Sequence, residues 1–244
     1  MKKLTALILA TALLLTLTFT SCDMIGGSVN PPSASTKKGD IVRFGQHDWR
    51  VLYVRSGSAL LLSDEVIEKR PYHTVSIGIT WENSSIREYL NGDFYNNIFT
   101  EEEKDKINDT DNDNKANPWF ETAGGNKTTD KVFLLSLDEV IKYFGDSGQL
   151  DNPNIEEYGG GMQYIQKEVS DEFNEERFAT DAETGRASPG WWTRTPGMRS
   201  ELAVDIDSFG RLNVTGTGVE GGGRKVDDVS HPGGMRPAMW IELE

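Results

Sequence analysis

The chain opens with one long apolar stretch and continues with short apolar runs separated by polar turns. Beyond residue 38, three short runs rich in apolar residues follow one another, and the run 49–54 alternates in part between apolar and polar positions. Such alternation places successive side chains on opposite faces of a sheet and predicts strands. The chain therefore predicts an antiparallel meander built from strands 41–44, 49–54 and 58–63, with a turn at 45–48.

Helical spacing of apolar residues appears in the middle of the chain. Thr100 and Ser136 each stand three residues before a glutamate, which is the capping-box pattern at the start of a helix. Asn91-Gly92 is a helix-ending pair. The predicted helices are 84–90, 100–107 and 136–145, and a buried strand is predicted at 132–135.

The last third returns to strand patterns, with a turn at Asp207-Ser208-Phe209-Gly210 that predicts a hairpin. Strands, then helices, then strands indicate an α+β domain with antiparallel sheets, two or three short helices and long loops. The predicted strands are 191–194, 202–206, 212–214 and 239–243, and the expected long loops are 108–130, 146–190 and 216–233.

The N-terminus has the order of a secretory signal peptide. Lys2 and Lys3 precede the apolar run, and the small residue Ser21 precedes Cys22, the only cysteine. This placement is typical of a bacterial lipoprotein signal, in which the cysteine is lipidated. The apolar run of about 16 residues is shorter than the roughly 20 that span a bilayer. An ordinary signal peptide that ends near a cysteine remains the alternative.

This N-terminus predicts three parts of the chain and a location. Residues 1–21 are expected to be the signal, 22–38 a Gly-, Pro- and Ser-containing tether, and 39–244 the globular domain. We expect the protein to be exported and lipid-anchored through Cys22 to the cell membrane or the outer membrane. Two acyl chains are enough for stable anchoring.

Charge and cysteine content exclude several classes of function. The chain has 25 basic and 39 acidic residues and a net charge of −14. Removing residues 1–21 takes away two lysines and no acid, which leaves −16. Such a surface repels phosphate backbones, so no nucleic-acid partner is expected. With Cys22 lipidated, no thiol remains for a disulfide, a zinc site or a nucleophile.

Carboxylates at every second position make one candidate metal site. Asp109, Asp111 and Asp113 could offer oxygen ligands to calcium, whereas a solvated acidic loop is the alternative. An EF-hand loop is not matched, because its sixth position is Asn114 and its twelfth is Phe120.

Two glycine motifs lack the context that their chemistry needs. The run 216–221 has the letters of the dinucleotide fingerprint, but no helix is predicted after it. The run 145–148 has the letters of a serine-protease motif without a suitable histidine. A pair of carboxylates for a glycosidase stays open, with these candidates: Glu121, Glu156, Glu157, Asp205 and Asp207.

Tryptophan and arginine in the last third give the candidate ligand site. Trp191 and Trp192 are consecutive on a predicted strand and should face opposite sides, one in the core and one near the surface as a stacking platform. Asp205 and Asp207 are the expected polar contacts beside them. Arg194 and Arg236 are expected to brace strands by pairing with these aspartates.

The ordered motifs resemble the uncharacterised bacterial domain-of-unknown-function family 6273 over about residues 39–243. The stretches that carry the resemblance are 39–45, 49–52, 86–92, 129–136, 192–197 and 234–238. The closing half is also similar to C-type-lectin-like domains of the formylglycine-generating-enzyme type, which pair a W-x-R strand with a terminal G-x-R strand.

These resemblances imply a C-type-lectin-like fold more than an activity. The formylglycine-generating enzymes use active-site cysteines, which this chain lacks after Cys22, and the Glu-Pro-Asn and Trp-Asn-Asp triplets of calcium lectins are absent. Fold alone does not settle function. We expect a non-catalytic surface lipoprotein that binds an extracellular glycan or protein. A carboxylate-dependent glycan hydrolase and a purely structural envelope lipoprotein are the alternatives.

Overall fold

The computed structural model describes residues 29–152, 155–158, 162–165, 168–220 and 233–244. Cys22, and with it the predicted signal peptide and lipid anchor, lies outside these residues. Of the predicted tether, residues 29–38 are described, and several of them form hydrogen bonds with the domain. Asn30 accepts a hydrogen bond from the Arg43 amide, and Glu244 accepts one from Ala34. This part of the tether therefore belongs to the folded unit.

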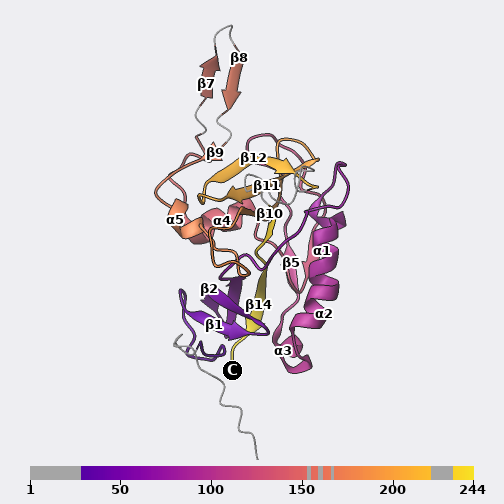
Figure 1. Cartoon of the computed structure of the whole chain (residues 1–244), viewed down its shortest axis with the longest axis vertical. Helices are drawn as coiled ribbons and strands as arrows, with labels where there is room; N and C mark the ends of the chain where they lie inside the picture. The colour runs from indigo at the N-terminus through magenta and orange to yellow at the C-terminus, as the bar shows by residue number, and fades with distance from the viewer. Residues whose placement is uncertain (1–28, 153–154, 159–161, 166–167, 221–232) are drawn as a thin grey trace, which may run out of the picture.

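A four-stranded antiparallel sheet joins the start and the end of the domain (Figure 1). Its strands lie in the order β1-β2-β3-β14. The predicted meander is confirmed, and the last strand pairs with β3 along five residues. The strand bounds are β1 Ile41–Phe44, β2 His47–Arg55, β3 Ser58–Ser63 and β14 Ala238–Glu242.

A six-stranded sheet forms the second half of the core. Its order is β4-β13-β10-β11-β12-β9, with β10 and β13 parallel and the other neighbours antiparallel. The predicted hairpin at 207–210 is confirmed as the β11–β12 turn, where Gly210 takes a positive φ. The bounds are β4 Glu68–Lys69, β9 Glu168–Val169, β10 Gly190–Pro196, β11 Leu202–Asp207, β12 Leu212–Gly218 and β13 Gly234–Met235.

Two further hairpins lie outside these sheets. β5 (Thr110–Asn112) pairs with β6 (Thr128–Asp130) inside the segment predicted as a loop. β7 (Ile155–Tyr158) pairs with β8 (Met162–Ile165) and projects from one end of the molecule (Figure 1).

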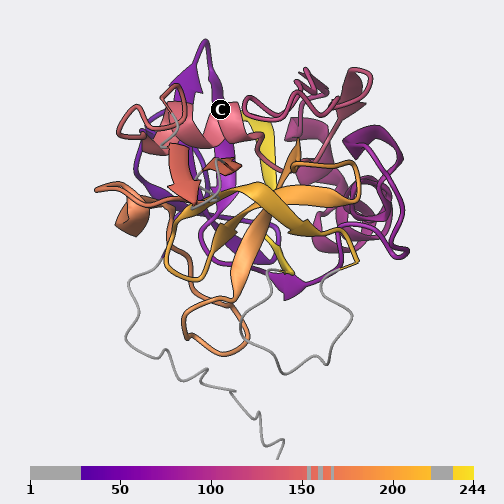
Figure 2. The same ribbon diagram turned by 90° about the horizontal axis from the view of Figure 1, so that it is seen from above.

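The helices are short and lie on the flanks of the sheets. Figure 2 shows the orange and yellow strands of the six-stranded sheet at the centre, with the helices of residues 81–106 on one side and α4 on the other. Both predicted capping boxes, at Thr100 and Ser136, are confirmed. The bounds are η1 Trp81–Asn83, α1 Ser85–Tyr89, η2 Leu90–Phe94, α2 Tyr95–Ile98, α3 Glu101–Lys106, α4 Leu137–Phe144 and α5 Asn174–Arg177.

Three local predictions are wrong. The first helix does not end at Asn91-Gly92, because a π-helical segment, η2, carries it on into α2. Residues 132–135 are fully buried but form only one bridge, from Phe133 to Ala238, instead of a strand. His47 was expected in a turn and instead begins β2, where it pairs with Phe44.

Buried aliphatic and aromatic side chains form one contiguous core. Trp49, Trp81, Trp191 and Trp192 are at most 1% exposed. The α+β class, with mostly antiparallel sheets and short helices, is confirmed. Within the described residues, no helix has the length and apolar character needed to cross a membrane.

Candidate functional site

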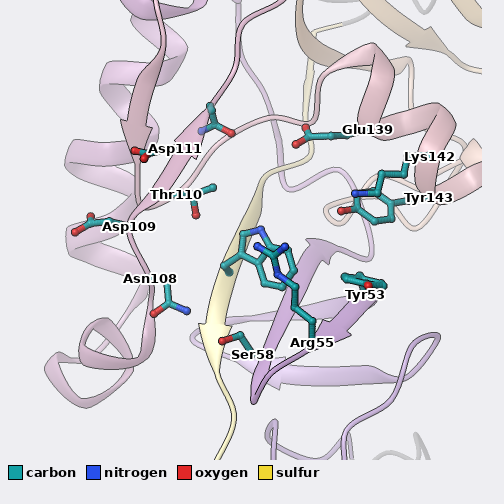
Figure 3. Close-up of a pocket in the computed structure, with 12 residues that line it drawn as sticks. Tyr53, Arg55, Ser58, Asn108, Asp109, Thr110, Asp111, Glu139, Lys142 and Tyr143 are labelled. Atoms are coloured by element: carbon teal, nitrogen blue, oxygen red, sulfur yellow. The ribbon is translucent and has the colours of Figure 1, made fainter.

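A polar hollow with an aromatic wall lies where the four-stranded sheet meets β5 and α4 (Figure 3). Its volume is about 550 Å³, within the range of small-ligand sites. The sheet supplies Tyr53, Arg55, Ser58 and Trp240, α4 supplies three side chains, and residues 108–112 supply the opposite wall. We call this hollow the β2–α4 pocket.

A β-bulge in β2 directs Tyr53 into the β2–α4 pocket. Val51 pairs with Leu61 and Tyr53 with Leu60, so Leu52 is the extra residue between them. Without the bulge, Tyr53 would share the buried face of Trp49 and Val51, because alternate residues share a face. The bulge instead turns Tyr53 outward, where it is 41% exposed.

Trp240 meets Tyr53 across the middle strand. Leu60 of β3 pairs with Tyr53 on one side and with Trp240 on the other, so the three side chains form one row on the same face. The two rings meet edge to face with centroids 6.3 Å apart. This row gives the pocket a hydrophobic floor made of two half-exposed rings over a buried leucine.

One face of α4 closes the pocket on the other side. Glu139, Lys142 and Tyr143 are at positions i, i+3 and i+4, which lie on one side of a helix. Leu137, Val140 and Phe144 are buried on the opposite side and hold the helix in the core. The Tyr143 ring lies 6.3 Å from that of Tyr53, so the three aromatic rings form a contiguous cluster.

Two cations lie over these rings. The Arg55 guanidinium carbon is 4.7 Å from the Trp240 ring centroid. The Lys142 ammonium is 5.0 Å from the Tyr143 centroid and 5.9 Å from that of Tyr53. Contacts between cations and ring faces at these distances are attractive. The aromatic cluster therefore holds two positive charges at the pocket.

The carboxylates that line the pocket have partners of their own. Asp109 pairs with Lys131 at 3.1 Å, Asp111 accepts a hydrogen bond from the Thr129 hydroxyl, and Glu139 pairs with Arg194. By contrast, the buried Thr110 hydroxyl has no hydrogen-bond partner among the described residues. Figure 3 shows Thr110 directed from β5 into the hollow. The opposite wall thus holds a hydroxyl without a partner in the described chain, next to carboxylates that already have partners.

The sequence prediction placed the ligand site on β10 instead, and its expectation of one exposed indole there is wrong. Trp191 and Trp192 are 1% and 0% exposed, because all seven residues of β10 are buried. Their indole N–H groups donate to the carbonyls of Arg177 and Arg70. Neither ring offers a surface for a ligand to stack on.

The two aspartates beside them lie in different environments. Asp205 is buried and accepts a hydrogen bond from the Asn213 amide, and its second oxygen has no partner in the described part of the chain. Burial raises the pKa of Asp205 well above its usual value. Asp207 accepts hydrogen bonds from the amides of Phe209 and Arg211 and organises the β11–β12 turn. Their contacts are structural ones within the hairpin.

Arg194 and Arg236 brace the fold, but not through the expected aspartates. Arg194 donates to the Leu134 carbonyl and pairs with Glu139 of α4. Arg236 donates to the carbonyls of Ser63 and Asp64, at the end of β3. Burial lowers the pKa of Arg236 to about 9, so the side chain stays charged at neutral pH. Arg194 therefore ties β10, and Arg236 the link between β13 and β14, to a neighbouring segment through backbone carbonyls.

The acidic run 109–113 is not assembled as a metal site. Asp113 pairs with Lys127 at 3.9 Å, and Asp109 and Asp111 have the partners given above. Across the part of the chain that the structure describes, no group of three acidic, histidine or cysteine side chains could hold a metal ion. The predicted calcium ligands Asp109, Asp111 and Asp113 are thus separate side chains on and beside one strand of a hairpin.

The other motifs also take structural places. Gly216 and Gly218 lie within β12 and not before a helix. Glu121 lies at an exposed turn with positive φ, and the side chains of Glu156 and Glu157 are outside the described residues.

A smaller hollow of about 210 Å³ lies beside His47, whose pKa is lowered by burial and by Arg43.

The sequence prediction missed the residues that form the β2–α4 pocket. One feature of the sequence does point to the pocket: the pair Val51-Leu52 breaks the alternation of β2 and marks the bulge before Tyr53. The meeting of β2, β14 and α4 depends on pairings between residues far apart in sequence, which no local pattern encodes.

Comparisons with known proteins identify the family but not an activity. The family model described as a domain of unknown function, DUF6273, matches residues 56–243, and the chain belongs to this family. No curated protein and no solved structure matched. The match begins one residue after β2 ends, so β1 and β2, including Tyr53 and Arg55, precede it.

Proposed function

We propose that this DUF6273 protein is a surface-anchored bacterial lipoprotein whose C-type-lectin-like domain binds an extracellular glycan without performing chemistry. The observation that carries the proposal is the aromatic cluster of Tyr53, Tyr143 and Trp240 in a polar pocket of about 550 Å³. Exposed aromatic rings offer an apolar face to a sugar ring, while surrounding polar groups can bind its hydroxyls.

The lectin-like part of the proposal is supported by one strand pairing. The W-x-R strand β10 lies parallel to β13, the G-x-R strand near the C-terminus, with Trp191 opposite Gly234. This neighbour relation is the one that the distant resemblance implies. The lipid anchor is supported by the sequence before Cys22 alone.

A glycan-binding screen with the full-length protein tests the proposal. Binding to one class of glycan is expected, and Tyr53→Ala should lower the affinity at least about tenfold, equivalent to about 1.4 kcal/mol. Phe209→Ala is the matched control, because Phe209 is 68% exposed on the β11–β12 turn, outside the pocket. This control should bind as the unaltered protein does.

Other outcomes separate the remaining functions. Release of shortened glycan during the screen would favour a hydrolase over a binding module. Capture of a protein through Tyr53 would show a protein ligand in place of a glycan. If the protein binds neither a glycan nor another protein, a purely structural role in the envelope would be favoured. Mass spectrometry of the membrane-bound protein should show a lipidated Cys22 at the N-terminus, and an unprocessed N-terminus would contradict the anchor.

A further inference from the structure

Two basic side chains of the β2–α4 pocket lack carboxylate partners, although acids outnumber bases in this chain by 39 to 25. Most arginines and lysines of the described ranges pair with an aspartate or glutamate, as Arg50 does with Asp64. Among these residues, neither Arg55 nor Lys142 has such a partner within 4.0 Å. Their contacts are with the rings of the aromatic cluster.

The aromatic cluster positions both cations without cancelling their charge. Arg55 lies over Trp240, and Lys142 lies beside Tyr53 and Tyr143. Contact with a ring face is attractive and leaves the N–H donors free. Figure 3 shows both side chains at the hollow, Arg55 from β2 and Lys142 from α4. An anion that enters the pocket would therefore meet two oriented donors.

The rest of the lining points to a saccharide that carries this anion. Tyr53 presents an exposed ring, and the Thr110 hydroxyl is buried without a partner on the opposite wall. On that wall Asp109 pairs with Lys131 and Asp111 accepts a hydrogen bond from the Thr129 hydroxyl, and across the pocket Glu139 pairs with Arg194. A cationic ligand would be repelled by Arg55 and Lys142, whereas a neutral sugar would leave both without a partner.

We propose that the β2–α4 pocket selects an acidic saccharide, with a sugar ring against Tyr53 and its carboxylate between Arg55 and Lys142. This inference rests on the proposed function and names the ligand class of the same site. Guanidinium groups bind carboxylates with paired hydrogen bonds, and ammonium groups add a point charge.

The test compares uronate oligosaccharides with their methyl esters, which keep the sugar but remove the charge. Oligogalacturonate and oligoglucuronate are titrated calorimetrically into the full-length protein. At least one uronate should bind at least about tenfold more tightly than its ester, and this advantage should shrink with added salt. In the double variant Arg55→Gln and Lys142→Gln, the advantage should fall to about twofold or less. Arg199→Gln, an exposed arginine outside the pocket, is the control.

The outcomes separate this inference from the proposed function. Equal binding of uronate and ester that Tyr53→Ala removes would overturn the acidic specificity and leave glycan binding standing. If polyglutamate binds as tightly as the uronates, the pocket does not select a saccharide, and that part of the inference fails. Binding of neither sugar form would overturn the inference, and the broader glycan screen with Tyr53→Ala would then decide the proposed function.

Discussion

Aromatic and arginine side chains occur together in two regions of this molecule and have opposite roles. In β10, Trp191, Trp192 and Arg194 are buried, and their donors are satisfied by carbonyls and Glu139. In the β2–α4 pocket, Tyr53 is exposed and Arg55 lacks a carboxylate partner within the described ranges.

Strand position and the β2 bulge account for the difference. β10 is a central strand covered on both faces, so its residue types add to the core whichever way they point. β2 has one covered face, and its bulge moves Tyr53 from that face to the other. A tryptophan or arginine in a motif therefore indicates a ligand site only when the position of its strand is known.

Trp192→Ala gives the largest expected effect. Because the ring is fully buried, its removal should lower the free energy of unfolding by about 3–5 kcal/mol. Tyr53→Ala should change it by less than about 1 kcal/mol, because the ring is partly exposed. Urea unfolding measures both. If Tyr53→Ala lowers the free energy of unfolding as much as Trp192→Ala does, the distinction between the two regions fails.

Asp205→Asn tests the buried hairpin next to β10 through pH. The pKa of Asp205 is raised in the folded state, so folding favours the protonated acid. Stability is therefore lost as pH rises from the unfolded value of 3.8 through the raised pKa. The variant cannot ionise there and should become more stable relative to the unaltered protein as pH rises from 4 to 8. If the difference in unfolding free energy between the variant and the unaltered protein is constant from pH 4 to 8, the pKa of Asp205 is not raised by folding.

Local chemistry explains which parts of this fold can be predicted. Short apolar runs between turns predicted β1, β3 and β14, and the capping boxes at Thr100 and Ser136 predicted two helices, because both signals lie within a few residues. The continuation through Asn91-Gly92 was missed, since Leu90 and Phe94 pack into the core and override the local signal to end the helix.

The site itself was less predictable than the fold. Exposure of one of the two indoles, Trp191 or Trp192, was wrongly expected because strand alternation does not show that both faces of β10 are covered. Tyr53, Tyr143 and Trp240 come from three distant segments, and only the bulge and the β3–β14 pairing bring them together.

Indole N–H signals in a nitrogen–proton correlation spectrum, recorded during titration with a bound glycan, test the central claim most directly. The account predicts that the Trp240 signal shifts, because this ring forms the pocket floor with Tyr53. The signals of Trp191 and Trp192 should stay in place, since both groups are buried and bonded to carbonyls. Shifts at Trp191 or Trp192 with none at Trp240 would contradict it.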